Sequence, residues 1–172
     1  GLTRPELAIL LSYTKIRSFE ELLDSPLVQG EENLHELVGY FPAPLRERFA
    51  TRIDQHPLRR EIIATHLANH VLNRMGATFL MRMTEATGAD TAEAVRAYLA
   101  ARDIYGLRGL WHEVNGLGDA VAIQHQQSAL HSIRALQEQA TRWLLRHPGG
   151  GGSDAAAGMA PMQQAVARLD EA

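Results

Sequence analysis

The chain has 172 residues, no cysteine and a formal net charge of −3 at pH 7. Without cysteine, it can form neither a disulfide nor a thiolate metal site, and cysteine nucleophile chemistry is excluded. A sequence pI near 6.2 argues against binding to nucleic acid or to an anionic membrane that is dominated by electrostatic attraction. The apolar content of 45% is ordinary for a globular domain, and no apolar run reaches the roughly 18 residues that span a bilayer. We expect one domain with a real core, with the cytoplasm as the default location.

The first sixteen residues predict a helix that begins at once. Thr3 and Glu6 have the spacing of a capping box, and Pro5 lies in the first turn, where its missing N–H costs nothing. One helical face then carries Leu7, Leu10, Leu11 and Thr14. Because the helix starts abruptly and no initiator methionine precedes it, we expect a piece of a longer protein.

A second capping box at Ser18 and Glu21 predicts a separate short helix over Ser18–Asp24. Residues 26–32 resemble a loop, and Asn33 is expected to cap a short helix that ends near Gly39. A proline-punctuated connection follows at residues 40–44.

Apolar residues recur at every fourth position from Leu45 to Ile53, which predicts another helix. His56 precedes Pro57 and is therefore pushed out of the α region, so a break is expected there. The next helix is predicted over Pro57–Met75, with Gly76 as its C-terminal cap. Its expected buried residues are Ile62, Ile63, Leu67, Val71 and Leu72.

Four further helices are expected in the rest of the chain. They are a helix from Phe79 to Thr87, one capped by Asp90 and Glu93 that runs to Tyr105 and is stopped by Gly106, one over residues 107–117, and a long one over Ala122–His147. The long helix places Ile123, Leu130, Ile133, Ala140 and Leu144 on one stripe, flanked by Leu136 and Trp143. Gln126 and Gln137 share that stripe, which weakens a coiled-coil interpretation. No convincing strand pattern occurs, so the predicted fold is all-α, an irregular bundle of about eight helices with short loops.

The composition changes after residue 148. Gly149–Gly152, Ser153 and the run to Gly158 predict a flexible linker with nothing to bury. A short helical segment, Gln163–Leu169, is expected after Pro161. We therefore assign residues 1–148 to a helical domain and residues 149–172 to a linker and a truncated tail.

Two histidines have the spacing of a metal site. His66 and His70 lie at i and i+4 on one predicted helix, but Leu67 stands where a hydrolytic zinc site needs a glutamate, and no third ligand is marked. We interpret them as histidines on a polar helix face, and we assign no metal-binding residue.

A cluster of arginines is the feature closest to a nucleic-acid site. It comprises Arg46, Arg48, Arg52, Arg59 and Arg60, and it is interleaved with Glu47, Asp54 and Glu61. The acidic neighbours favour intrahelical ion pairs over phosphate contacts. A free-standing nucleic-acid- or partner-binding module remains the alternative hypothesis, although we do not expect nucleic acid to be a partner.

Other candidate motifs are better explained by structure. The glycines at 149–152 have no strand before them and no Lys-Ser/Thr step after them, and Gly116-Leu117-Gly118 is typical of a helix end rather than a dinucleotide loop. Trp111 and Trp143 lie at the spacing of core residues, and the acidic pairs at 20–21 and 31–32 are expected on solvated faces. No nucleophile–base–orienter set is found. We therefore assign no catalytic residue and no cofactor-binding residue to this chain.

Long strings of this sequence closely resemble the C-terminal part of the large bacterial NAD-specific glutamate dehydrogenases. These strings are GLTRPELAILLSYTKI, YFPAPLRERFATRIDQHPLRREIIATHLANHVLNRMGATFLMRMTEATGA, AYLAARDIYGLRGLWHEVNGL and ATRWLLRHP. They cover residues 1–148 in collinear order. Residues 149–172 match poorly, apart from short similar stretches at Ala160-Pro161 and Ala167-Arg168-Leu169.

The resemblance implies a much longer parent enzyme that deaminates L-glutamate oxidatively to 2-oxoglutarate and ammonia and transfers hydride to NAD. The family's catalytic and nucleotide-binding motifs lie upstream of the matched segment, so the resemblance assigns no such residue here. It implies a non-catalytic helical region whose partners are the catalytic region of the same chain and further copies in a homo-oligomer. Its expected roles are support of catalysis, assembly or regulation, with no membrane partner.

Overall fold

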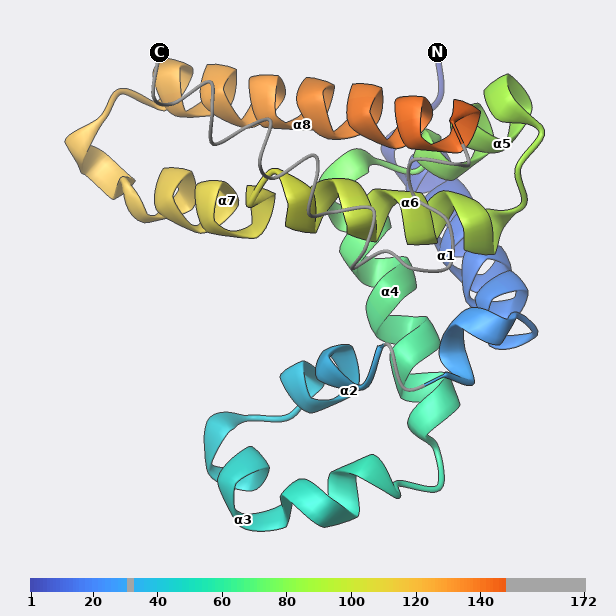
Figure 1. Ribbon diagram of the computed structural model, residues 1–172. Coiled ribbons are helices and arrows are strands. Elements are labelled where there is room, and N and C mark those ends of the chain that lie inside the picture. Colours follow the sequence, from blue (N-terminus) through green and yellow to red (C-terminus); the bar gives the residue numbers. More distant parts are fainter. Residues whose placement is uncertain (31–32, 148–172) are drawn as a thin grey trace. The chain divides into compact units, whose positions relative to one another are not determined.

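The computed structural model describes residues 1–30 and 33–147, which form eight α-helices joined by short connections (Figure 1). They are α1 (Arg4–Leu23), α2 (Leu34–Tyr40), α3 (Ala43–Asp54), α4 (Arg59–Met75), α5 (Phe79–Thr87), α6 (Thr91–Ile104), α7 (Leu107–Gly116) and α8 (Ile123–Arg146), with 3₁₀ turns at Pro26–Val28 and Gly118–Ala120. The described ranges contain no strand, so the predicted all-α class is confirmed. The linker and the short helix predicted beyond residue 148 lie outside the described residues.

Packing divides the chain into two compact units. The first unit comprises Gly1–Arg82 with Asp90–Val95, and the second comprises Met83–Ala89 with Arg96 onward. α6 therefore contributes its first residues to the first unit and its remainder to the second. Each unit has its own buried residues.

The N-terminal helix α1 is continuous over 20 residues, so the prediction of a separate helix from Ser18 is wrong. The capping box at its start is confirmed: the Glu6 carboxylate accepts hydrogen bonds from the Thr3 N–H and the Thr3 hydroxyl, each at 2.7 Å. Ser18 is buried inside the helix and caps nothing. Its expected partner, Glu21, instead accepts hydrogen bonds from Arg17 and from the Thr91 hydroxyl at the start of α6.

Glu21 is therefore only half solvated, which corrects the expectation of a solvated acidic pair; Glu20 beside it is exposed. The acidic pair at 31–32 lies outside the described residues. Burial by itself raises the pKa of Glu21. The hydrogen bonds from Thr91 and Arg17 and the positive charge of Arg17 lower this pKa by more than burial raises it. The net pKa lies below the ordinary value of 4.5.

This lowered pKa predicts an acid-dependent loss of stability. A carboxyl group whose pKa is depressed by folding contributes stability above its unfolded pKa, and the contribution disappears as the pH falls through the folded pKa. We expect Glu21→Gln to lose less unfolding free energy than the wild type as the pH falls below 4.5. Urea denaturation at a series of pH values measures this difference. Parallel pH profiles for the two proteins would contradict it.

The first unit is built around α4. α1, α2 and the 3₁₀ turn at Pro26–Val28 pack against this helix (Figure 1). The predicted buried face of α4 is confirmed at Ile63, Leu67, Val71 and Leu72, whereas Ile62 is half-buried. The helix begins at Arg59, two residues later than predicted, because Pro57 and Leu58 form a turn in which the Leu58 N–H donates to His56 Nδ1 at 3.1 Å.

α2 and α3 form a small arm on this unit. α2 packs against α4, and α3 packs against α2. α3 buries only Ile53, and its backbone leaves helical geometry at Phe49, where φ is −128°. α3 therefore gains little stability from the burial of its own apolar side chains.

In the second unit, α7 and α8 lie side by side (Figure 1). Two apolar clusters hold α8 in place. One contains Ala101, Ile104, Ala140 and Leu144, and the other contains Leu107, Trp111 and Ile133. Between α6 and α7, Gly106 adopts φ +59°, a left-handed conformation that glycine takes without strain, and this ends α6 as predicted.

The two glutamines on the apolar stripe of α8 each hydrogen bond a backbone carbonyl of another helix. The Gln137 side-chain amide donates to the Tyr98 carbonyl at 2.8 Å, and that of Gln126 donates to the Val114 carbonyl at 2.8 Å. Gln137 is 1% exposed, so its hydrogen bond lies within the core. These polar residues fix where α8 sits against α6 and α7.

No helix within the described ranges is both long and apolar enough to cross a lipid bilayer.

Candidate functional site

The densest group of titratable side chains surrounds Glu36 on α2. This glutamate is only 2% exposed. One carboxylate oxygen lies 3.1 Å from His35 Nε2, and the other lies 3.1 Å from His66 Nδ1 on α4. The edge of the Tyr40 ring approaches the His66 ring, with 6.2 Å between centroids. A buried carboxylate thus lies between two imidazoles at the α2–α4 contact.

Each oxygen of Glu36 lies 3.1 Å from an imidazole nitrogen, and the contact with His66 is the one that spans α2 and α4. His66 Nδ1 is buried and has no partner in hydrogen-bonding geometry among the described residues, so this contact is one of proximity and charge. A carboxylate that orients an imidazole also occurs in catalytic triads and in the outer shell of zinc sites, where the other ring nitrogen faces a nucleophile or a metal. Sequence patterns do not mark Glu36, because α2 has only seven residues, too few for periodicity to show which face is buried.

The histidine pair proposed from spacing is brought together in part. The rings of His66 and His70 are 6.2 Å apart between centroids and inclined by 60°, and both side chains are half-buried. His66 faces Glu36 rather than a shared point with His70. Across residues 1–30 and 33–147, no group of three or more potential metal-ligating side chains occurs.

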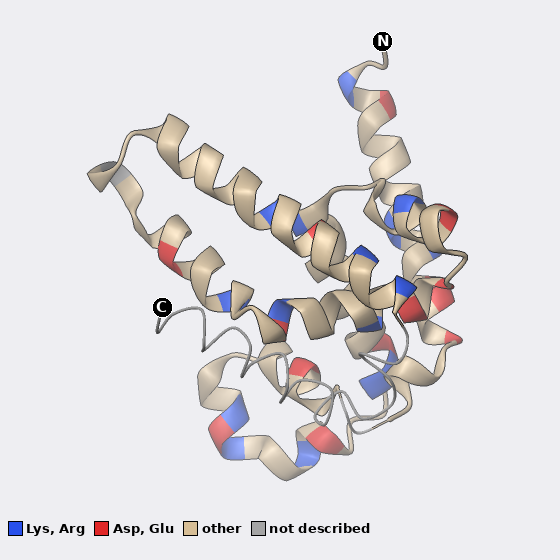
Figure 2. Cartoon of the chain, turned by 45° about the horizontal axis from the view of Figure 1, so that its top comes forward, with Lys and Arg blue, Asp and Glu red and all other residues tan. Residues whose placement is uncertain are grey.

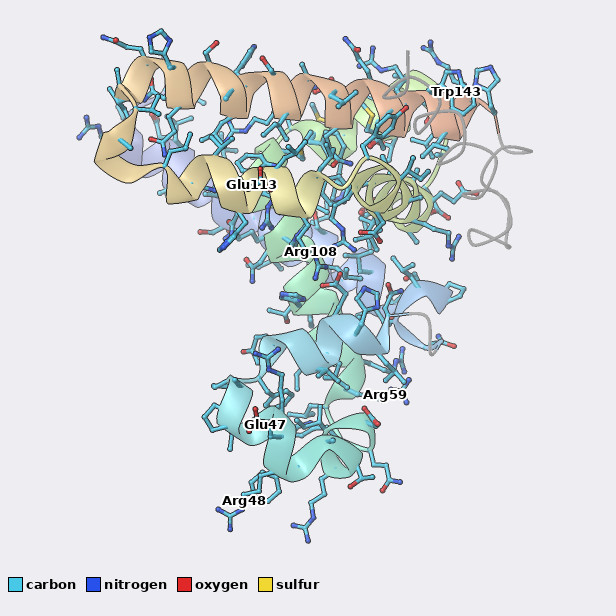
Figure 3. All side chains as sticks on the ribbon, turned by 60° about the vertical axis from the view of Figure 1, so that its left-hand side comes forward. Glu47, Arg48, Arg59, Arg108, Glu113 and Trp143 are labelled. Carbon is cyan, nitrogen blue, oxygen red and sulfur yellow. The ribbon has the colours of Figure 1, made fainter. Side chains whose placement is uncertain are left out.

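The five arginines of the predicted cluster do not form one surface. Arg60 donates to the Leu23 carbonyl at 2.7 Å, and Arg59 donates to the Gly30 carbonyl at 3.4 Å. Arg60 therefore ties the start of α4 to the end of α1, and Arg59 ties it to the connection that follows α1. Arg48 lies over the Phe49 ring at 5.3 Å and points away from the ribbon of α3 (Figure 3). The remaining members, Arg46 and Arg52, are exposed on α3.

Because Arg60 bonds within the fold and Arg46 is exposed, we expect substitutions of these two arginines to lower the free energy of unfolding by different amounts. Arg60→Ala removes a charged donor from a backbone carbonyl, so we expect it to lower the unfolding free energy by about 1 kcal/mol. Arg46→Ala, on the exposed face of α3, should change it by less than about 0.5 kcal/mol. Chemical denaturation of both variants checks this order, and a cost for Arg46→Ala equal to or above that of Arg60→Ala would refute it.

The two tryptophans have different surroundings. Trp111 is buried beside Leu107 and Ile133, as predicted, with the Arg134 guanidinium 5.7 Å from its ring centroid. The core assignment of Trp143 is wrong: this side chain, labelled near the end of α8 in Figure 3, is 46% exposed. It stacks on His147 with 4.5 Å between ring centroids. Trp143 lies beside the apolar stripe of α8. Sequence periodicity cannot tell whether a residue at such a position is buried or half-exposed, which is why the core assignment failed.

The glycine motifs have separate outcomes. Gly116 ends α7, and Gly118 begins a 3₁₀ turn, so this pair marks a helix end as predicted. The run at 149–152 lies outside the described residues.

Exposed apolar side chains gather on α1 between Leu7 and Ile16. Six of them have exposed fractions between 39% and 68%: Leu7, Ile9, Leu10, Leu11, Tyr13 and Ile16. Figure 2 shows this part of the helix as a stretch almost without charged residues, beyond the bands near its start. Since a solvated helix normally has a wide polar face, this segment has the composition of a helix that packs on more than one side.

Comparison with known proteins gives a consistent result. The family model described as "Glutamate dehydrogenase, C-terminal" matches residues 1–172, which extends beyond the 148 residues of the sequence resemblance. The NAD-specific glutamate dehydrogenase of Halomonas elongata is 36% identical over 146 residues, which are 85% of this chain and 9% of that protein. The enzyme of Pseudomonas aeruginosa is 37% identical over 146 residues, with the same two shares.

A third relative, the NAD-specific glutamate dehydrogenase of Mycobacterium tuberculosis, is 36% identical over 147 residues, which are 86% of this chain and 9% of that protein. The chain thus spans about a tenth of the length of the curated relatives it matches. The identities and the full-length family match lead to one conclusion: the chain belongs to the glutamate dehydrogenase C-terminal family.

Proposed function

We propose that this chain is the non-catalytic helical C-terminal region of a long NAD-dependent glutamate dehydrogenase. Residues 1–148 would support the catalytic region of the same chain and its assembly into a homo-oligomer. The parent reaction converts L-glutamate, NAD and water into 2-oxoglutarate, ammonia and NADH. Support comes from the relatives, which carry that enzyme name and in which the matching stretch is 9% of the chain.

The contacts of the buried polar groups are the observation that favours a supporting role. Glu36 joins α2 to α4, and Gln137 joins α8 to α6. Buried Thr141 donates to the Gln137 carbonyl at 2.7 Å within α8. Polar groups that bind a substrate converge on a shared concave site, whereas these groups bridge helices or bond within one helix. Their placement suits a scaffold.

The proposal places the NAD site of the parent enzyme outside residues 1–147. A Rossmann-type dinucleotide site needs a glycine-rich turn between a strand and the N-terminus of a helix. The described residues form helices without strands, and Gly116 and Gly118 follow a helix. These residues therefore do not fit a dinucleotide site of that type.

Deletion of this region from the full-length enzyme tests the proposal. We expect the truncated enzyme to retain NAD binding, measured by calorimetry, but to inactivate at a lower temperature and to lose its assembled mass in light scattering. A truncated enzyme with wild-type activity, assembly and thermal inactivation would refute a supporting role. Loss of NAD binding by a truncated enzyme that remains folded would place cofactor residues in this region.

The alternative of a nucleic-acid-binding module has less support, because Arg59 and Arg60 are used within the fold. Binding of duplex DNA at low ionic strength distinguishes the two, since phosphate contacts are strongest there. The supporting role predicts no binding. Salt-dependent binding that weakens with Arg46→Ala and Arg48→Ala would favour the alternative.

A further inference from the structure

Two stripes of α1 differ in what covers them. Ser18 and Leu22 lie on one side of α1 and are buried, and α1 packs against α4. At 100° per residue, Ile9, Tyr13 and Ile16 lie on roughly the opposite side of the helix. Their exposed fractions are 55%, 68% and 52%. We call these three residues the outer stripe of α1.

The outer stripe has the spacing of a recognition helix. Its residues follow i, i+4 and i+7, the pattern by which a helix places apolar anchors in a groove. Arg4, Ser12 and Lys15 lie on the polar side of this segment, whereas Glu6, in the first turn, lies near the outer stripe. Together, the exposed apolar side chains of α1 extend over roughly 220° of its circumference, well beyond the stripe of about 100° or slightly more that a surface helix needs to cover a core.

The exposed apolar area is large for an uncovered surface. Six large apolar side chains, each between 39% and 68% exposed, lie within the segment from Leu7 to Ile16. On soluble proteins, contiguous exposed apolar patches larger than a few hundred Å² mark interaction sites. This segment of α1 therefore has the character of a contact surface.

We propose that the outer stripe of α1 docks into the part of the full-length enzyme that precedes Gly1. This inference rests on the proposed function. The matching family region is C-terminal and makes up 9% of each relative, so most of a relative's chain precedes it. Of the described helices, α1 lies nearest in sequence to any preceding segment, and covalent continuity gives such a segment a high effective concentration at its surface.

The distribution of side chains favours this occupant over a second copy of the chain. A symmetric contact with another α1 would cover one side of the helix and leave the remaining apolar arc in water. Several elements of a preceding folded region can enclose more of the arc. A second copy is therefore a separate outcome of the test.

Photo-crosslinking of the full-length enzyme tests the inference. The photoreactive residue p-benzoylphenylalanine replaces Tyr13, and the crosslinked peptides are identified by mass spectrometry. We expect intrachain crosslinks to residues that precede Gly1, with little crosslinking from the same reagent at Ala8, on the polar side. Crosslinked dimers, crosslinks confined to residues 1–172, or equal yields from both positions would overturn the inference.

A pair of charge substitutions gives a matched control. With the photoreactive residue at position 13, Ile16→Glu should reduce the intrachain yield about tenfold or more, because burying an unpaired carboxylate costs more than the 1.4 kcal/mol that corresponds to a tenfold change. Ser12→Glu, on the polar side of the same helix, should leave the yield unchanged. Equal yields in the two variants would contradict docking through the outer stripe.

The two hypotheses fail in different ways. If deletion of the region harms assembly but Tyr13 gives no upstream crosslink, the supporting role stands and the outer stripe is not its docking surface. If Tyr13 crosslinks upstream but deletion leaves stability and assembly unchanged, docking occurs without the proposed support.

Discussion

Leu67→Ala is expected to lower the free energy of unfolding of this chain by about 2–5 kcal/mol. Leu67 is fully buried on α4, the helix against which α1 and α2 pack. Truncation removes apolar burial and leaves a cavity that the surrounding helices fill only in part. Urea denaturation followed by far-ultraviolet circular dichroism measures the loss.

The matched control for this substitution is Leu58→Ala. Leu58 directly precedes α4 and is 55% exposed, so the same chemical change there should cost less than about 1 kcal/mol. Similar costs at the two positions would mean that α4 is not the centre of the first unit.

Gln137→Ala should lower the free energy of unfolding by about 2–4 kcal/mol, because it removes a buried side chain of leucine-like size together with its hydrogen bond. Gln137 is 1% exposed and donates to the Tyr98 carbonyl. Gln137→Met keeps most of the volume and should cost about 1–1.5 kcal/mol. Thermal or chemical unfolding of both variants separates the contribution of volume from that of the hydrogen bond.

Two results would count against this account of Gln137. If Gln137→Met is as costly as Gln137→Ala, the hydrogen bond rather than the volume dominates. If neither substitution is costly, Gln137 does not fix the position of α8 in the second unit.

Helix existence and most helix ends could be predicted because they depend on local chemistry. Gly106 and Gly76 end α6 and α4 as expected, with positive φ angles of +59° and +88°. The cap at Thr3 is also local, since Glu6 lies one turn away. Such signals need only neighbouring residues, so one sequence is enough to find them.

Contacts between distant segments could not be predicted in the same way. The pair Ser18 and Glu21 has the spacing of a capping box, yet Glu21 bonds to Thr91, 70 residues away. Gln137 is a polar residue on an apolar stripe, and its burial is explained by a hydrogen bond to the Tyr98 carbonyl on another helix, which no local pattern predicts. Glu36 gave no signal at all, because α2 is short and the contact of Glu36 with His66 joins two helices.

The family assignment came from a different kind of information. Periodicity and capping predict an all-α chain but no reaction, and the candidate motifs at His66 and the arginine cluster led to no site. The collinear strings over residues 1–148 predicted the family, and the match over residues 1–172 confirms it. Periodicity does not show which helix face is left exposed, whereas the exposed fractions of the α1 side chains identify one such surface.

Thermal inactivation of the full-length enzyme carrying Leu67→Ala tests the supporting role most directly. This substitution weakens the helical region from inside, at a fully buried residue. If the region supports the catalytic part, glutamate-dependent NADH formation should be lost at a lower temperature than in the wild type and in the Leu58→Ala control. If instead Leu67→Ala unfolds the helical region while the enzyme inactivates at the wild-type temperature, this region does not support catalysis.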